Sequence, residues 1–266
     1  MSDTALGVLA WVAYAVFGLV LGSFLTVVVY RVPRKESIVR PRSRCPGCGT
    51  QIRTADNIPV ISWALRRGRC RSCGESISMR YPLTELATAA LWVAAAAEFG
   101  ILTWTSLVFA LFFTFLLAVS LIDVEHRIIP NKLTYPAVPV FAVLVAVGVL
   151  MGEDLDLVGA LIGLLTYAGG LLVVAFVYPK GMGMGDVKLA AVIGLVLGAL
   201  GPLRYVLPAA MFAFLLGAVG GMLAIAVGKK GRKSAIPFGP FMAAGAVLAV
   251  FLGPPIMDWY LQILGG

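Results

Sequence analysis

Long apolar stretches separated by short polar segments dominate the chain. A stretch of about 20 apolar residues is long enough to cross a hydrocarbon core of about 30 Å as a helix. Backbone inside lipid must satisfy its own hydrogen bonds, which favours helices over an open sheet. The pattern therefore predicts an all-α polytopic membrane protein with about eight transmembrane helices, at roughly 6–30, 83–99, 103–122, 134–151, 157–178, 187–201, 205–228 and 239–262.

The composition supports a membrane environment for most of the chain. Of the 266 residues, 60% are hydrophobic and only 13% are charged, whereas soluble domains carry about 25% charged residues. The formal net charge of +8 raises the possibility of a nucleic-acid partner. The basic residues, however, follow the polar segments between spans, so we expect membrane lipid and no nucleic acid as partners. The stretch 6–30 has no basic segment before it and no small-residue cleavage site after it, which predicts a retained helix.

The basic residues also predict an orientation. In the eight-span interpretation, 20 of the 21 Lys and Arg residues fall on one side of the membrane, in segments 31–82, 123–133, 179–188 and 229–238. Arg204 alone falls on the other side. Positive loops remain in the cytosol, so we expect the four basic segments to face the cytosol.

All four cysteines lie in the first polar segment, as two CxxC pairs: Cys45, Cys48, Cys70 and Cys73. Four thiolates in this spacing are typical of a structural zinc site with no open coordination position. A segment this small has little core, so metal binding would supply its folding energy. Two disulfides or a redox pair are the alternatives, but a reducing cytosol disfavours structural disulfides. The sequence predicts a small cytosolic zinc-binding loop domain between helices 1 and 2.

Two acidic residues are placed at the same predicted face of the membrane. Asp123 ends the third predicted span and Asp186 opens the sixth. Charges at membrane depth are costly and often mark function. Two carboxyl groups that share a site hold one proton between them, which suits peptide hydrolysis by a water molecule. The alternative is that each is an ordinary helix-end residue, with Asp186 favoured by the helix dipole.

The residues around Asp186 suggest where a peptide would bind. Gly181, Gly183 and Gly185 precede the aspartate at alternate positions. A backbone without Cβ atoms permits close approach of an extended substrate, which could add to it as a strand. We therefore predict substrate contact at Gly183, Gly185 and Lys188. For Lys188 the alternatives are an ammonium that reaches the membrane surface or a local counter-ion.

The chain resembles the bacterial type IV prepilin peptidase family, a branch of the GxGD aspartic proteases. The resemblance covers nearly the whole chain and includes both CxxC pairs, the Asp123 segment and Gly181–Lys188. Further matching segments are Gly22–Pro33, Asn57–Trp63, Arg80–Leu86 and Ile236–Phe241.

This resemblance implies both a substrate and a second activity. Family members cut the short basic leader from type IV prepilins and type II secretion pseudopilins at the cytosolic membrane face. Many then methylate the new N-terminus with S-adenosylmethionine. The catalytic residues would be Asp123 and Asp186. The chain would divide into transmembrane helix 1 (1–30), a cytosolic tetra-cysteine domain (31–82) and a transmembrane aspartic protease domain (83–266).

Two other functions fit parts of the sequence. A proton-coupled transporter also uses membrane carboxylates, although no inverted repeat or midplane charge is visible here. A non-enzymatic assembly factor could bind pilins through the cysteine loop. The sequence does not identify the pilins, the methyl-donor site, the distance between the aspartates or the oligomeric state.

Overall fold

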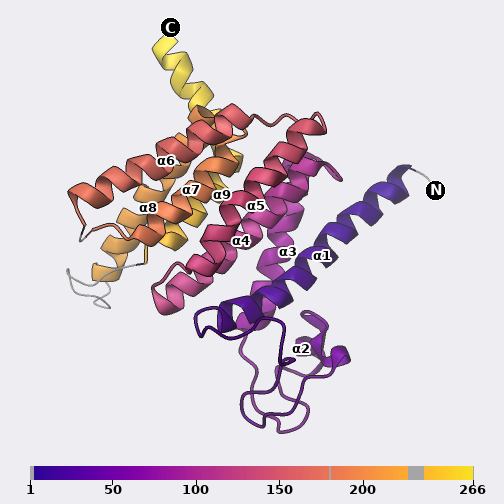
Figure 1. Cartoon of the computed structure of the whole chain (residues 1–266). Helices are drawn as coiled ribbons and strands as arrows, with labels where there is room; N and C mark the ends of the chain where they lie inside the picture. The colour runs from indigo at the N-terminus through magenta and orange to yellow at the C-terminus, as the bar shows by residue number, and fades with distance from the viewer. Residues whose placement is uncertain (1–2, 180, 227–236, 266) are drawn as a thin grey trace. The chain divides into compact units, whose positions relative to one another are not determined.

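A computed structural model describes residues 3–179, 181–226 and 237–265 of the chain (Figure 1). These residues form long helices, with strand pairing limited to two isolated bridges in the cysteine loop. The chain divides into two compact units, Met1–Ala118 and Val119–Gly266, which are described separately. The predicted all-α fold is confirmed.

The first unit contains α1 (Asp3–Arg31), the cysteine loop, α3 (Arg80–Phe99) and the first part of α4 (Trp104–His126). The loop includes a 3-10 turn at Thr54–Asn57 and the short helix α2 (Ile61–Leu65). Helices α1 and α3 pack closely because α1 presents glycines to its neighbour. A Cβ atom on Gly18 would lie 2.5 Å from the Ala89 Cα atom, so only glycine permits this approach.

Glu85 joins α3 to the cysteine loop. Its side chain is buried, and its carboxylate accepts a hydrogen bond of 2.7 Å from the backbone N–H of Val60. Val60 has a φ of 59° and precedes α2. The carboxylate therefore holds the backbone turn at which this short helix begins.

The second unit contains the end of α4, α5 (Asn131–Leu150), α6 (Leu157–Val177) and α7 (Met184–Gly198). A π-helical turn at Pro202–Val206 leads into α8 (Leu207–Ala226), and α9 (Gly239–Gly265) follows the undescribed segment. Helix α7 is buried on nearly every side, against α5, α6 and α9. Figure 1 shows α6 and α9 beside it.

A seam of glycines brings α6 and α7 into backbone contact. A Cβ atom on Gly163 would lie only 2.2 Å from the Gly194 carbonyl oxygen, and one on Gly198 would lie 2.4 Å from the Gly159 carbonyl oxygen. Small residues of this kind allow membrane helices to approach closely. The seam fixes α7, and hence Asp186 at its first turn, against α6.

Within the described parts of the chain, six helices are long and apolar enough to cross a membrane: α1, α4, α5, α6, α8 with its preceding turn, and α9. The chain is therefore a multi-pass membrane protein, but the predicted count of eight spans is not confirmed. Helix α7 has 15 residues, about 22 Å at 1.5 Å per residue, which is shorter than a hydrocarbon core of about 30 Å. Helix α3 carries the buried polar residues Thr84, Glu85 and Thr88.

Candidate active site and metal site

Asp123 lies in the last turn of α4 and is buried, with 5% of its surface exposed. Its Oδ2 atom accepts a hydrogen bond of 3.0 Å from the backbone N–H of Gly239. Gly239 is the first residue of α9 and is itself buried. A free N–H at the start of a helix is a natural partner for a carboxylate. Asp123 is thus held by a residue 116 positions away in the chain.

Asp186 lies in the first turn of α7 and is half-buried. Its Oδ2 atom accepts a hydrogen bond of 3.2 Å from the backbone N–H of Gly183, the residue that precedes the helix. The carboxylate therefore caps its own helix. The sequence suggested that an extended substrate adds as a strand along Gly181, Gly183 and Gly185, but helix α7 begins at Met184, which makes Gly185 helical.

The two aspartates come together at adjacent helix ends. Ile129, in the segment between α4 and α5, connects their surroundings. A Cβ atom on Gly185 would lie 3.0 Å from the Ile129 Cβ atom, and one on Gly239 would lie 3.3 Å from the Ile129 Cδ1 atom. The helix ends that carry the two carboxyl groups thus converge around one side chain.

Tyr167 is a third polar group at this site that the sequence did not reveal. It lies in α6, is 5% exposed, and its hydroxyl has no hydrogen-bond partner among the described residues. Its helix packs against α7, which carries Asp186. A buried, unpaired hydroxyl is costly and often reflects a functional role. The only sequence indication was one tyrosine within the otherwise apolar stretch 157–177.

The contacts of Lys188 are with α5. Its Nζ atom donates a hydrogen bond of 2.8 Å to Asn131 Oδ1 and lies 4.7 Å from the centre of the Tyr135 ring. The ammonium therefore connects the start of α5 to the first turns of α7. Such a contact positions α7 against α5 close to Asp186.

The four cysteines form one cluster in the first unit. The Sγ atoms of Cys45, Cys48, Cys70 and Cys73 all lie within 4.8 Å of one another, and all four are free thiols. The Cys45 and Cys73 sulfur atoms are 3.8 Å apart. A tetrahedral zinc site with Zn–S bonds of about 2.3 Å has sulfur-to-sulfur edges of about 3.8 Å. The cluster therefore fits a four-thiolate metal ion.

The two CxxC pairs adopt the same local structure. In each, the N–H of the first cysteine donates to a carbonyl five residues later, at 2.9 Å for Cys45 and 2.8 Å for Cys70. The glycine after each second cysteine has a positive φ, 69° for Gly49 and 75° for Gly74. Only glycine adopts this conformation readily. The repeated turn presents both cysteines of each pair toward one point.

The backbone also favours ionised sulfur in this cluster. N–H groups of Cys73 and Ser72 lower the pKa of Cys70 to about 6. For Cys73, the N–H of Glu75 stabilises the thiolate, but desolvation and the three neighbouring sulfurs together raise its pKa to about 12. Four crowded thiols cannot all ionise without a cation. A bound metal ion would remove that repulsion.

Helical membrane architecture, a pair of aspartates at adjacent helix ends and a tetra-cysteine loop define a polytopic membrane protein with two distinct sites. Residues 16–99 match the bacterial peptidase A24 N-terminal domain, and residues 110–225 match the type IV leader peptidase family. The chain belongs to the type IV leader peptidase family.

Several curated relatives are similar over almost their full length. A prepilin leader peptidase/N-methyltransferase of Bacillus subtilis is 36% identical, over 94% of this chain and 98% of the relative. Proteins of the same name from Pseudomonas aeruginosa and Dichelobacter nodosus are 35% and 37% identical, over 93% and 90% of this chain and 92% and 91% of those relatives. No solved structure shows a significant match to the chain.

Proposed function

We propose that this protein is a membrane aspartic endopeptidase that removes the leader from type IV prepilins or pseudopilins and then N-methylates the new N-terminus. Membership of the leader peptidase family and the names of the full-length relatives support both activities. The observation that carries the peptidase assignment is the convergence of Asp123 and Asp186. Neither a proton-coupled transporter nor a non-enzymatic assembly factor is favoured.

Asp123 and Asp186 are the proposed catalytic residues. An ionised carboxylate takes a proton from the attacking water, while a protonated one polarises the carbonyl of the scissile bond. The water oxygen then bonds to the carbonyl carbon, and the C–N bond breaks as the leaving amine gains a proton. The N–H groups of Gly239 and Gly183 hold the two carboxylates in place.

Substrate contact is proposed for Gly183, Gly185 and Lys188. Gly183 precedes α7 in extended backbone, which suits pairing with an extended peptide. Lys188 reaches the substrate only if it leaves Asn131, so its role here is secondary to positioning α7. Tyr167 is proposed as a residue whose unpaired hydroxyl binds the peptide substrate or the attacking water beside Asp186.

The cysteine cluster is proposed to hold a structural zinc ion. Four sulfur ligands leave no position for water, so the ion would stabilise the loop rather than take part in catalysis. We further propose an inner-membrane location with the catalytic aspartates and the cysteine loop at the cytosolic face. The proposed domains are helix 1 (1–30), the tetra-cysteine domain (31–82) and the protease domain (83–266).

Separate Asp123→Asn and Asp186→Asn variants test the peptidase assignment. Each keeps the shape of the side chain but removes its ability to exchange a proton. We expect each to abolish leader cleavage of a prepilin in proteoliposomes, measured by product mass, while the amount of folded protein is unchanged. Cleavage at the wild-type rate in either variant would refute the assignment.

Asp258→Asn provides a matched control for the loss of one carboxylate. Asp258 forms an exposed ion pair of 2.9 Å with Arg204, and exposed ion pairs contribute little to stability. This variant should cleave the prepilin normally. Proton flux through the wild-type protein without any peptidase activity would instead favour a transporter.

A further inference from the structure

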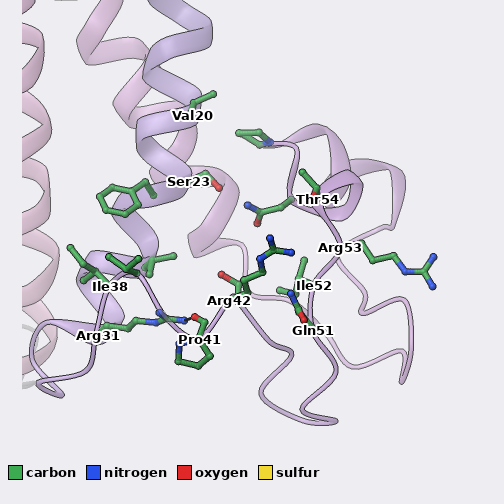
Figure 2. Close-up of a pocket in the computed structure, with 16 residues that line it drawn as sticks. Val20, Ser23, Arg31, Ile38, Pro41, Arg42, Gln51, Ile52, Arg53 and Thr54 are labelled. Carbon is green, nitrogen blue, oxygen red and sulfur yellow. Dashed lines mark hydrogen bonds between the residues drawn. The ribbon is translucent and has the colours of Figure 1, made fainter.

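The first unit contains a cavity of about 730 Å³ where the end of α1 meets the cysteine loop (Figure 2). Ligand sites in proteins commonly measure about 300–1,000 Å³. Val20, Ser23 and Phe24 of α1 line one side, and Gln51 and Asn57 of the loop line the other. All of the lining residues fall within 20–59, so the cavity belongs to the matched N-terminal domain and includes neither the aspartates nor the cysteines.

Positive charge dominates the wall of this cavity. Arg31, Arg42 and Arg53 line it, and no Asp or Glu among the described residues does. Asp56, which adjoins a lining residue in the chain, already pairs with arginines of the loop itself. Like charges repel, so neither the basic leader of a prepilin nor the positively charged donor S-adenosylmethionine fits this wall. The expected occupant therefore carries a net negative charge.

The three arginines have different roles in the wall. Arg31 donates hydrogen bonds of 2.8 Å to the carbonyl oxygens of Ser37 and Pro41, so it fastens the loop to the end of α1 and shapes the cavity. In Figure 2 the guanidinium of Arg53 points away from the other labelled side chains, whereas that of Arg42 extends among them. Within the described part of the chain, no hydrogen bond or ion pair engages the Arg42 side chain. Arg42 therefore offers its charge to a ligand.

An exposed apolar stripe on α1 leads into the cavity. It consists of four exposed side chains that recur every four residues: Val12, Val16, Val20 and Phe24. This spacing aligns them in one row along the helix surface. Val20 and Phe24 also line the cavity, so the stripe and the cavity form one continuous surface. Helix α1 is a candidate membrane span that ends at Arg31, which places the stripe at the depth of acyl chains and the arginines at the depth of lipid headgroups.

We propose that this cavity binds the headgroup of one anionic phospholipid, whose acyl chains lie along the stripe on α1. The Arg42 guanidinium donates two hydrogen bonds to phosphate oxygens. The Ser23 hydroxyl and the amides of Gln51 and Asn57 supply further donors. Anionic lipids are abundant in the cytosolic leaflet, where the loop is proposed to lie. The bound lipid fastens the cysteine loop to α1 at the membrane surface, a role that goes beyond the proposed catalytic activities.

The test compares phosphatidylglycerol with phosphatidylcholine of the same acyl chains, added to the full-length protein in detergent. Native mass spectrometry measures the bound lipid, and the melting temperature reports stabilisation by a ligand that binds the folded state. We expect phosphatidylglycerol to bind about tenfold or more tightly than phosphatidylcholine and to raise the melting temperature. Arg42→Ala should weaken phosphatidylglycerol binding about tenfold or more and abolish that rise, while the melting temperature without lipid stays the same.

Arg53→Ala is the matched control for the loss of one charge. It removes an exposed arginine from the same loop, but its guanidinium points away from the other labelled lining residues (Figure 2). Salt screens such a distant charge, so this variant should bind phosphatidylglycerol within about twofold of the wild type. Equal weakening by the two arginine variants would indicate diffuse attraction to a basic loop and would overturn the site. Equal binding of the two lipids would overturn it as well.

A second variant and a soluble headgroup test the cavity and the stripe. Ser23→Phe changes no charge but fills the cavity, so it should also weaken phosphatidylglycerol binding about tenfold or more. Glycerol phosphate has no acyl chains to lie on the stripe and should bind at least tenfold more weakly than the lipid; binding as tight as that of the lipid would show a site for free phosphate instead. Unchanged lipid binding in either Arg42→Ala or Ser23→Phe would overturn the site. None of these outcomes depends on prepilin cleavage, so the lipid site and the proposed function can fail separately.

Discussion

Replacing Gly239 by alanine should impair catalysis, because the Asp123 carboxylate occupies the space that a side chain at this position would need. A Cβ atom at this position would lie 2.7 Å from the Asp123 Oδ2 atom. An ordinary carbon–oxygen contact starts near 3.4 Å, so either the carboxylate or the start of α9 must move by about 0.7 Å in Gly239→Ala. That movement stretches or breaks the 3.0 Å hydrogen bond that holds Asp123.

The expected size of the effect follows from two considerations. A hydrogen bond to a charged group contributes about 1.5–3 kcal/mol, and a misplacement of about 1 Å can cost 10²-fold in rate. We therefore expect Gly239→Ala to lower kcat for leader cleavage by about 10- to 100-fold. KM should change little, because the substitution alters a carboxylate that acts on the reacting bond rather than one that binds the substrate.

The assay is steady-state cleavage of a prepilin in detergent, with the melting temperature measured on the same samples. Gly169→Ala is the matched control, because a Cβ atom there would have no neighbour within 4 Å. It should cleave at the wild-type rate. If Gly239→Ala kept the wild-type kcat, the hydrogen bond to Asp123 would have no catalytic role. A loss of activity that the fall in melting temperature fully explains would also refute the argument that the position of Asp123 matters.

Three further predictions concern residues outside this contact. Tyr167→Phe should reduce kcat about tenfold without lowering the melting temperature, because the hydroxyl it removes is unpaired within the described part of the chain and is free to bind the substrate or the attacking water; an unchanged kcat would exclude a role for this hydroxyl in the reaction. Cys45→Ser should lower bound zinc, measured by metal analysis, and reduce methylation more than cleavage; equal loss of both activities would show that the loop supports both sites. Gly163→Ala should lower the melting temperature, at a cost of about 1–3 kcal/mol from overpacking, whereas Gly169→Ala in the same helix should not; equal melting temperatures would contradict the close packing of α6 on α7.

Local spacing was enough to predict the cysteine cluster. Cys45 and Cys48 lie in one turn and Cys70 and Cys73 in another, and each turn carries its own glycine. The arrangement therefore depends on a few neighbouring residues, and the structure confirms that the four sulfur atoms gather at one point. Whether the ion is zinc depends on chemistry that spacing alone does not determine.

The carboxylate pair was predictable only in part. Apolar stretches placed Asp123 and Asp186 at the ends of helices on one face, but they carry no information about which helices touch. The Gly239 N–H and the Tyr167 hydroxyl reach the site through the packing of α9 and α6, which are remote in sequence. The count of spans was least certain, because the apolar pattern of α7 reflects burial within protein as readily as burial in lipid.

The glycine seam between α6 and α7 also limits how a substrate can enter. The carbonyl oxygens of one helix contact the backbone of the other, so a methyl group does not fit between them. A substrate helix, which is much larger, cannot pass between α6 and α7 at this point. The seam closes α6 against the second half of α7, about two to three helical turns from Asp186. A substrate therefore reaches Asp186 by a path other than this interface.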